Sequence, residues 1–252
     1  MKDVAFITLT NSGYINYTLN CLESLKRIGL SSKLHAYVIG KEGYDLLKEK
    51  GYNCSLIEDE ENSNFQTFRK GNWSDITFKK FIIIHENLKK YKYVCFTDGD
   101  IVFENKNFLQ YLRDNIESYD MLIQNEQLND NDKSNVCSGF MYIKSNKNTL
   151  SLLNPEIVKH SKRKKKWGDQ TYINKIKTKM KYKLLPLGLF PNGQYYYKNN
   201  SNMSPYMIHF NWLEGHKKRE KMKYYNKWYL DSKQNKTKNN KTKNNKTKKN
   251  KK

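Results

Sequence analysis

The sequence has few cysteines and prolines and no long hydrophobic run. Its 252 residues include four prolines and four cysteines, at positions Cys21, Cys54, Cys95 and Cys137. The cysteines form no Cys-x-x-Cys motif, so we expect reduced thiols and no disulfide framework. No stretch approaches the roughly 18 apolar residues of a membrane span, and the first residues lack the basic and small-residue pattern of a secretory signal. These absences predict a soluble, cytoplasmic protein.

Acidic residues are scarce beside basic ones, with 25 Asp and Glu against 47 Lys and Arg, giving a formal net charge of +22. Residues 231–252 hold ten Lys and one Asp in a repeat of Asn, Lys and Thr, and no apolar residue follows Leu230. Such a segment buries nothing that would offset its conformational entropy. We therefore predict one folded domain, residues 1–230, and a disordered basic tail, residues 231–252, that contacts polyanions only weakly.

A second basic cluster lies inside the predicted domain, at residues 162–166. Three interpretations stay open for it: a nuclear-import patch, a phosphate-facing loop, or a solvated run of charge. A solvated run of charge is the most common of these in proteins, and the cluster by itself assigns no function.

Apolar runs alternate with segments of helical periodicity along most of the chain. Residues 4–10, 34–39, 54–57 and 93–97 read as strands, and residues 17–28, 44–50 and 78–90 as helices. The second half is less regular, with strands expected at residues 121–124 and 139–144 and near Leu184 and Met207, and helices around residues 108–116 and near Thr149 and Asp169. This alternation predicts a single α/β domain with a mostly parallel, Rossmann-like central sheet flanked by helices.

Two carboxylates follow the strand predicted at residues 93–97. Only Gly99 separates Asp98 from Asp100, so both can face one cation, and hard oxygen ligands suit Mg²⁺ or Mn²⁺. A simple Asp-Gly turn is the alternative. The other Asp-x-Asp triplet, Asp130 to Asp132, lies in a polar stretch with no strand before it and reads as a solvated loop.

Three later segments carry further candidate residues, each with an ordinary structural explanation. Ser138 and Gly139 stand at the entry of a strand, where backbone can approach a ligand closely. Asp169 begins a helix, followed by Gln170, and could serve simply as its N-cap. His209 ends an apolar strand and could be a satisfied core histidine; after it, a turn offers Asn211, Gly215 and Lys217.

These motifs, taken in order, resemble one known family. The order is Thr-Asp98-Gly-Asp100, Ser138-Gly139-Phe, Gly-Asp169-Gln170, Leu-Phe190-Pro-Asn-Gly193, and His209-Phe-Asn-Trp-Leu-Glu-Gly215 with Lys217. It is similar to that of the nucleotide-diphospho-sugar transferases, which are glycosyltransferases of the GT-A type with an Asp-x-Asp motif. The resemblance extends from about residue 79 to residue 228. It implies a GT-A-like fold and transfer of a sugar, from a donor that is UDP-linked in many members, to a hydroxyl of a glycan or other acceptor, with retention of configuration.

The resemblance also implies roles for individual residues. Metal ligands for Mn²⁺ or Mg²⁺ would be Asp98, Asp100 and His209. Donor-binding residues would be Asp98, Lys80, Ser138, Gly139 and Lys217, with Lys79 competing for the role of Lys80. Asp169 and Gln170 would lie at the donor sugar, near its reacting carbon. One departure concerns Asn211, because the family often has His-Asn-Asn where this chain has His-Phe-Asn.

Two other functional classes stay open at this point. The string Asp98-Gly-Asp100-Ile-Val also fits the Asp-x-Asp-x-Val signature of haloacid-dehalogenase-like phosphatases, but those enzymes carry it on their first strand and need a second acidic pair downstream. The basic tail and residues 162–166 could instead mark a nucleic-acid-binding module, although no aromatic-basic motif or zinc site accompanies them.

Overall fold

Strands and helices alternate through the chain in the computed structural model, which describes residues 1–67, 69–161 and 168–230. The predictions for the tail at residues 231–252 and for the cluster at residues 162–166 lie outside these described residues.

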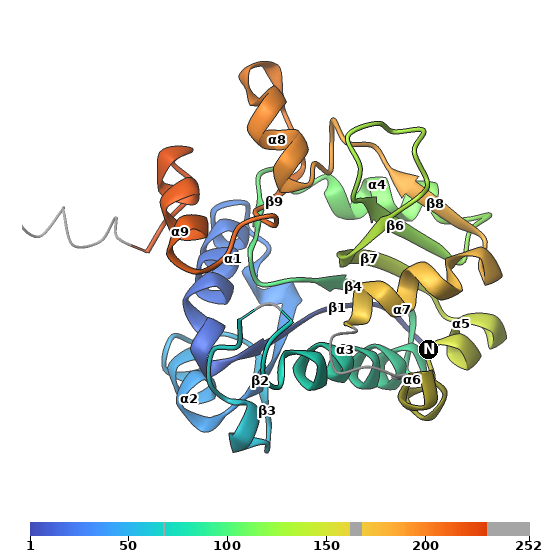
Figure 1. Cartoon of the computed structure of the whole chain (residues 1–252), viewed down its shortest axis with the longest axis horizontal. Helices are drawn as coiled ribbons and strands as arrows, with labels where there is room; N and C mark the ends of the chain where they lie inside the picture. The colour runs from blue at the N-terminus through green and yellow to red at the C-terminus, as the bar shows by residue number, and fades with distance from the viewer. Residues whose placement is uncertain (68, 162–167, 231–252) are drawn as a thin grey trace, which may run out of the picture.

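Seven strands form the central sheet, in the order β3-β2-β1-β4-β7-β6-β8. The strands are β1 (Lys2–Asn11), β2 (Leu34–Ile39), β3 (Cys54–Ile57), β4 (Tyr91–Thr97), β6 (Met121–Asn125), β7 (Val136–Lys144) and β8 (Tyr182–Leu185). All neighbouring pairs are parallel except those made by β7, which runs antiparallel to β4 and β6. The predicted mostly parallel sheet is therefore confirmed (Figure 1).

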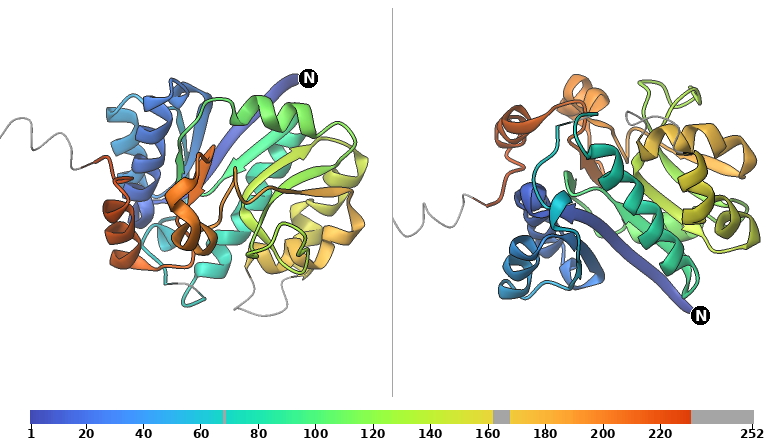
Figure 2. Two further views of the ribbon diagram at one scale, coloured as in Figure 1. Left: turned by 90° about the horizontal axis from the view of Figure 1, so that it is seen from above. Right: turned by 60° about the horizontal axis from the view of Figure 1, so that its bottom comes forward.

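The helices cover both faces of this sheet (Figures 1 and 2). They are α1 (Ile15–Arg27), α2 (Lys41–Glu49), α3 (Trp73–Leu88), α4 (Phe108–Asn115), α5 (Lys147–Leu152), α6 (Pro155–Ser161), α7 (Asp169–Ile176), α8 (Gly193–Asn199) and α9 (Gly215–Tyr224). Side chains of α1, α2 and α4 pack on one face of the sheet, and those of α3, α6 and α7 on the other.

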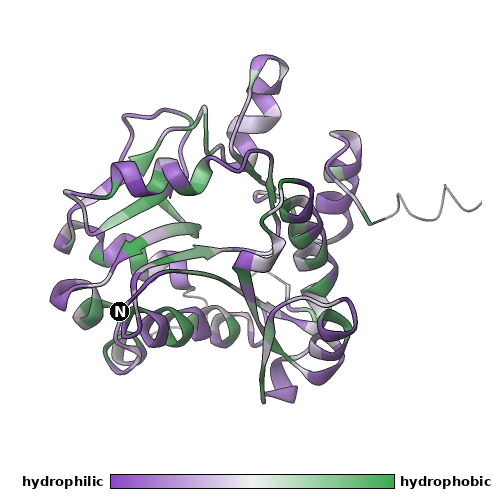
Figure 3. Ribbon diagram, turned by 180° about the vertical axis from the view of Figure 1, so that it is seen from behind, coloured by the Kyte–Doolittle hydropathy of each residue, from purple (hydrophilic) through white to green (hydrophobic). Residues whose placement is uncertain are grey.

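The alternation of side chains along a strand explains why the strands are apolar throughout. In β1, Phe6 packs in the cluster under α1, whereas Ala5 and Ile7 pack in the cluster under α3. A strand buried on both faces needs apolar residues at odd and even positions alike. Figure 3 shows hydrophobic residues along the central strands and hydrophilic ones over much of the helices. None of the helices in the described ranges is long and apolar enough to cross a membrane.

A second, small sheet was not predicted. It pairs β5 (Ile101–Phe103) with β9 (Met207–His209) in antiparallel register, with Ile101 opposite His209. The helices α8 and α9 flank β9 (Figure 1) and were also missing from the prediction.

Two candidate segments lie in other elements than we expected. The segment around residue 217, which we expected to be a turn, is helical from Gly215 onward. Ser138 and Gly139 lie inside β7, not at its entry.

Candidate active site

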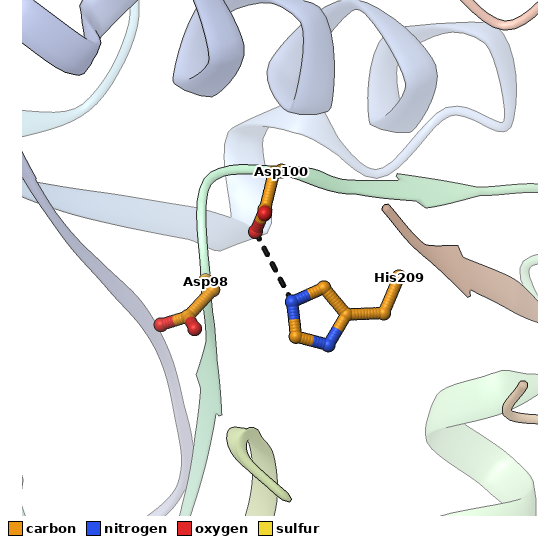
Figure 4. Close-up of side chains that lie close together, drawn as sticks. All are labelled: Asp98, Asp100 and His209. Atoms are coloured by element: carbon orange, nitrogen blue, oxygen red, sulfur yellow. Dashed lines mark ion pairs between the residues drawn. The ribbon is translucent and has the colours of Figure 1, made fainter. Parts of the chain in front are cut away.

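The small sheet brings the two aspartates and the histidine together. Asp98 directly follows β4, Asp100 directly precedes β5, and His209 is the last residue of β9. One ligand atom from each of the three lies within 4.8 Å of the others, and the His209 Nε2 atom is 3.2 Å from the Asp100 Oδ1 atom (Figure 4). Residues more than 100 positions apart in the sequence thus form one cluster at the carboxyl end of β4, where open α/β sheets bind ligands.

Two glycines allow this close approach. A Cβ atom at Gly99 would lie 2.4 Å from the Thr18 Oγ1 atom. A Cβ atom at Gly139 would lie 2.3 Å from the His209 Cε1 atom and 2.8 Å from the Asp98 Oδ2 atom. All three distances are below van der Waals contact, so the cluster requires glycine at both positions.

The variant Gly139→Ala is expected to weaken divalent-cation binding about 10- to 100-fold, the range found when a residue that orients metal ligands is altered. The added methyl group must displace His209 or Asp98, or both. Isothermal titration calorimetry with Mn²⁺ measures the change in affinity. Gly188→Ala is the matched control, because a Cβ atom there meets nothing within 4 Å; equal affinities in both variants would contradict the assignment of the cluster as a cation site.

The far side of the His209 ring is fixed by residues of β6 and β7. The Nδ1 atom is 2.7 Å from the Gln124 Oε1 atom and 3.6 Å from the Cys137 sulfur. The Gln124 amide nitrogen donates to the carbonyl groups of Phe190 and Pro191, so its oxygen must face the histidine and accept the Nδ1 proton. A neutral His209 then turns the lone pair of Nε2 toward the Asp100 carboxylate, and a cation between these two acceptors satisfies both. The residues present therefore fit a divalent metal.

Lys80 joins the acidic pair to Asp169. Its side chain is almost fully buried, and its amino group contacts the Asp98 Oδ1 atom at 3.1 Å and the Asp169 carboxylate. The same amino group donates to the Ser138 carbonyl oxygen at 3.1 Å, and the Ser138 hydroxyl donates to Asp169 at 2.7 Å. The neighbouring Lys79 instead pairs with Asp59, at 2.7 Å. The structure thus places Lys80 at the site and Lys79 outside it.

Lys218, which the sequence did not single out, contacts the other carboxylate. It forms an ion pair with Asp100 and donates to the Tyr14 hydroxyl at 2.6 Å, and that hydroxyl lies 3.3 Å from Asp100. Lys217, which the resemblance implied as the donor-binding lysine, is exposed to solvent on α9. Adjacent residues of a helix point in directions about 100° apart, so only one of these lysines can face Asp100.

The two aspartates differ in their electrostatic surroundings. Burial raises the pKa of Asp98, and Lys80 only partly opposes this effect. Burial also disfavours the charge of Asp100, but neighbouring positive charge, above all that of Lys218, outweighs it and holds the pKa of Asp100 well below its usual range. Asp100 is therefore ionised at neutral pH, as a metal ligand must be.

Gln170 directly follows Asp169 at the start of α7 and is half-buried. Glu126 and Gln124 on one side, and Tyr14 on the other, are site residues that the sequence interpretation missed. All three lie at or just after the carboxyl end of a strand of the sheet, β6 or β1, and this position was the available signal.

The polar stretch that contains Asp130 and Asp132 lies apart from this cluster, in the loop between β6 and β7. Asp130 accepts the amide of Leu187 at 2.7 Å and Asp132 that of Ser134 at 2.9 Å. The stretch is therefore a loop, as the sequence predicted, and both carboxylates accept backbone amides.

Comparison with known proteins finds similarity to glycosyltransferases. A curated relative, UDP-galactose:fucoside alpha-3-galactosyltransferase of Dictyostelium discoideum, is 26% identical over 283 aligned positions, which cover 89% of this chain. The chain spans only 43% of the length of that relative.

Solved structures show the same fold at low sequence identity. The glycosyltransferase GlyE of Streptococcus pneumoniae TIGR4 matches 92% of this chain with 61% of its own, at a TM-score of 0.59 and 13% identity. The galactosyltransferase LgtC, solved with donor and acceptor sugar analogs, matches 81% of this chain with 86% of its own, at a TM-score of 0.56 and 11% identity. The fold of this chain is therefore that of the GT-A glycosyltransferases, as expected. The sequence profile of one family matches residues 36–225, three quarters of the chain, and on this match the chain belongs to the nucleotide-diphospho-sugar transferase family.

Proposed function

We propose that this chain is a metal-dependent glycosyltransferase. It takes a sugar from a nucleoside-diphosphate donor, with UDP as the nucleotide, and transfers it with retention to a hydroxyl of a glycan or other acceptor. The observation that carries this proposal is the cluster of Asp98, Asp100 and His209, flanked by two buried lysines, in a chain of this family. The family assignment leaves the phosphatase and nucleic-acid interpretations without support.

Asp98, Asp100 and His209 would hold the metal, Mn²⁺ or Mg²⁺. When bound, such an ion neutralises charge on the diphosphate of the donor and on the departing nucleoside diphosphate. Lys218 would add a second positive charge on a flexible stem, in the place that the sequence prediction gave to Lys217.

The residues around Lys80 would arrange the donor sugar. The Asp169 carboxylate already forms an ion pair with Lys80 and accepts a hydrogen bond from the Ser138 hydroxyl. Its role is therefore to orient these two groups. Gly139 leaves space beside Asp98 and His209. Gln170 is the candidate that remains for stabilising positive charge on the reacting carbon, because the transition states of glycosyl transfer resemble an oxocarbenium ion.

Aromatic rings beside Lys218 suit the base of the nucleotide. Tyr14 and Tyr17 lie with their ring centres 4.5 Å apart, and Phe65 stacks on Tyr14 with an interplanar angle of 15°. Phe65 is 43% exposed, so part of this aromatic surface is open to solvent. Aromatic side chains bind nucleobases by stacking, with little dependence on the base.

Release of nucleoside diphosphate from a panel of UDP-, GDP- and other nucleotide sugars tests the proposal. We expect release with Mn²⁺, none with EDTA, and preference for one donor. UDP-galactose is the first candidate and a simple fucoside the first acceptor, because the curated relative is named for these compounds. If no nucleotide sugar in the panel is hydrolysed and none binds in a metal-dependent way, the proposal is refuted. NMR of the product determines the stereochemistry.

A further inference from the structure

The chain turns back after α9 and runs against α1, and the proposed function gives this segment no role. We call residues 225–230 the clasp. Asn226 has a left-handed backbone, with a φ of 57°. Its N–H donates to the carbonyl group of Lys223 at 2.9 Å, and the N–H of Lys227 donates to that of Met222 at 2.7 Å. These hydrogen bonds form a Schellman motif, which fixes the direction of the clasp relative to α9.

One buried side chain of α1 holds the clasp. Asn20 is fully buried, and its amide nitrogen donates to the Lys227 carbonyl oxygen at 2.9 Å. The amide oxygen of Asn20 accepts the backbone N–H of Tyr229 at 2.7 Å. A buried amide without partners would destabilise the fold, and these two contacts satisfy both ends of it. Asn20 therefore determines the path of the clasp over α1.

Charged and aromatic side chains add to this contact. Lys227 pairs with Glu104 at 2.6 Å, and the Tyr229 hydroxyl lies 3.3 Å from the same carboxylate. The Arg27 guanidinium lies 4.0 Å from the centre of the Tyr229 ring. These groups are partly exposed, so each interaction contributes little by itself. The buried amide of Asn20 is the main anchor of the clasp.

The helix α9 connects the clasp to the active site. It begins at Gly215, whose carbonyl oxygen accepts the hydroxyl of Tyr17 of α1 at 2.7 Å. Three residues further on, Lys218 contacts Asp100 and the Tyr14 hydroxyl. The helix lies beside α1 (Figures 1 and 2). Lys218 is thus presented by a helix that α1 holds both at its first residue and just beyond its last.

We propose that Asn20 is a positioning residue for Lys218, acting through the clasp and α9. This inference rests on the proposed function, in which Lys218 adds positive charge at the diphosphate of the donor. Lysine carries its charge on a flexible stem, so the charge stays in place only if the helix does. A displacement of about 1 Å can lower a rate about 100-fold, even when the altered residue is remote from the reaction.

The test compares Asn20→Ala in two backgrounds, wild type and Lys218→Met. The readouts are turnover of the donor that the panel selects and calorimetric binding of UDP in the presence of Mn²⁺. In the wild-type background we expect kcat/KM to fall about 10- to 100-fold, with a loss of UDP affinity, because Lys218 no longer stays at the diphosphate. In the Lys218→Met background the same substitution should change either quantity less than about threefold, since residues that act through one another are not additive.

Two further variants accompany this comparison. Asn53→Ala is the matched control, because the Asn53 amide also donates to a backbone carbonyl, that of Ser32 at 2.8 Å, at an exposed place between α2 and β3. Lys227→Met weakens the clasp without altering α1, and it tests the same proposal should Asn20→Ala fail to fold. We expect it to lower UDP affinity about two- to fivefold, as for a partly exposed ion pair, and only when Lys218 is present.

Hydrogen exchange measures the hold on α9 directly. The backbone amides of Gly215–Tyr224 should exchange about 10-fold faster in Asn20→Ala than in wild type, because release of the clasp favours local opening of the helix. Unchanged exchange, or equal losses in the two backgrounds, would overturn the inference while the proposed function stands. A wild type that turns over no donor and binds no UDP would refute the proposed function, and this inference with it.

Discussion

Turnover is expected to fall about a hundredfold or more when Asp100 is replaced by asparagine, because even partners that merely orient a metal ligand contribute about 10- to 100-fold. The amide keeps the size of the carboxylate but removes the charge that Lys218 and His209 surround. Nucleoside-diphosphate release at saturating donor measures the loss, over a Mn²⁺ titration that shows whether metal affinity falls as well.

The control for this variant is Asp132→Asn, the same chemical change in the loop between β6 and β7, where the side chain accepts the backbone N–H of Ser134. It should retain wild-type turnover. Circular dichroism establishes that both variants fold. A folded Asp100→Asn protein with wild-type turnover and Mn²⁺ dependence would show that Asp100 is not a metal ligand.

Replacing Lys80 with methionine is expected to destabilise the protein by about 3–5 kcal/mol, the effect of removing one partner from a buried ion pair. Methionine preserves most of the volume and the helical propensity of the site in α3. It leaves the carboxylates of Asp98 and Asp169 near each other without the cation that now lies between them. Urea unfolding in EDTA measures this loss without compensation from a bound metal.

Lys79→Met is a closely matched control, one position earlier in the same helix. Lys79 pairs with Asp59, and both side chains are partly exposed, so its loss should cost about 1 kcal/mol or less. Lys80→Arg keeps the charge and offers a second variant should Lys80→Met fail to fold. Equal unfolding midpoints for Lys79→Met and Lys80→Met would contradict the buried network.

The fold was largely predictable because its central strands are buried on both faces. Each of the first four strands of the sheet is a short apolar run followed by a helical pattern or a turn signal, and this arrangement specifies a mostly parallel sheet. The strand β5 and its pairing with β9 escaped prediction, because each of these strands has three residues and finds its partner about 100 positions away. No local pattern encodes such a pairing.

The sequence by itself determined which chemical groups are available. An acidic pair after a buried strand, and a histidine at the end of another, already indicated a metal site, since strand ends gather at one edge of a sheet. It could not choose between Lys79 and Lys80, because that choice depends on which face of α3 meets β4.

The tertiary structure alone decided the remaining contacts. The helix α9 begins at Gly215, and from this start its turn directs Lys218 toward Asp100 and Lys217 toward solvent. Asn211 donates to Glu126, which directly follows β6, although the two residues are 85 positions apart in the sequence. Residue types and strand ends are properties of the sequence, but the direction of each side chain depends on packing between distant segments, which only the folded chain defines.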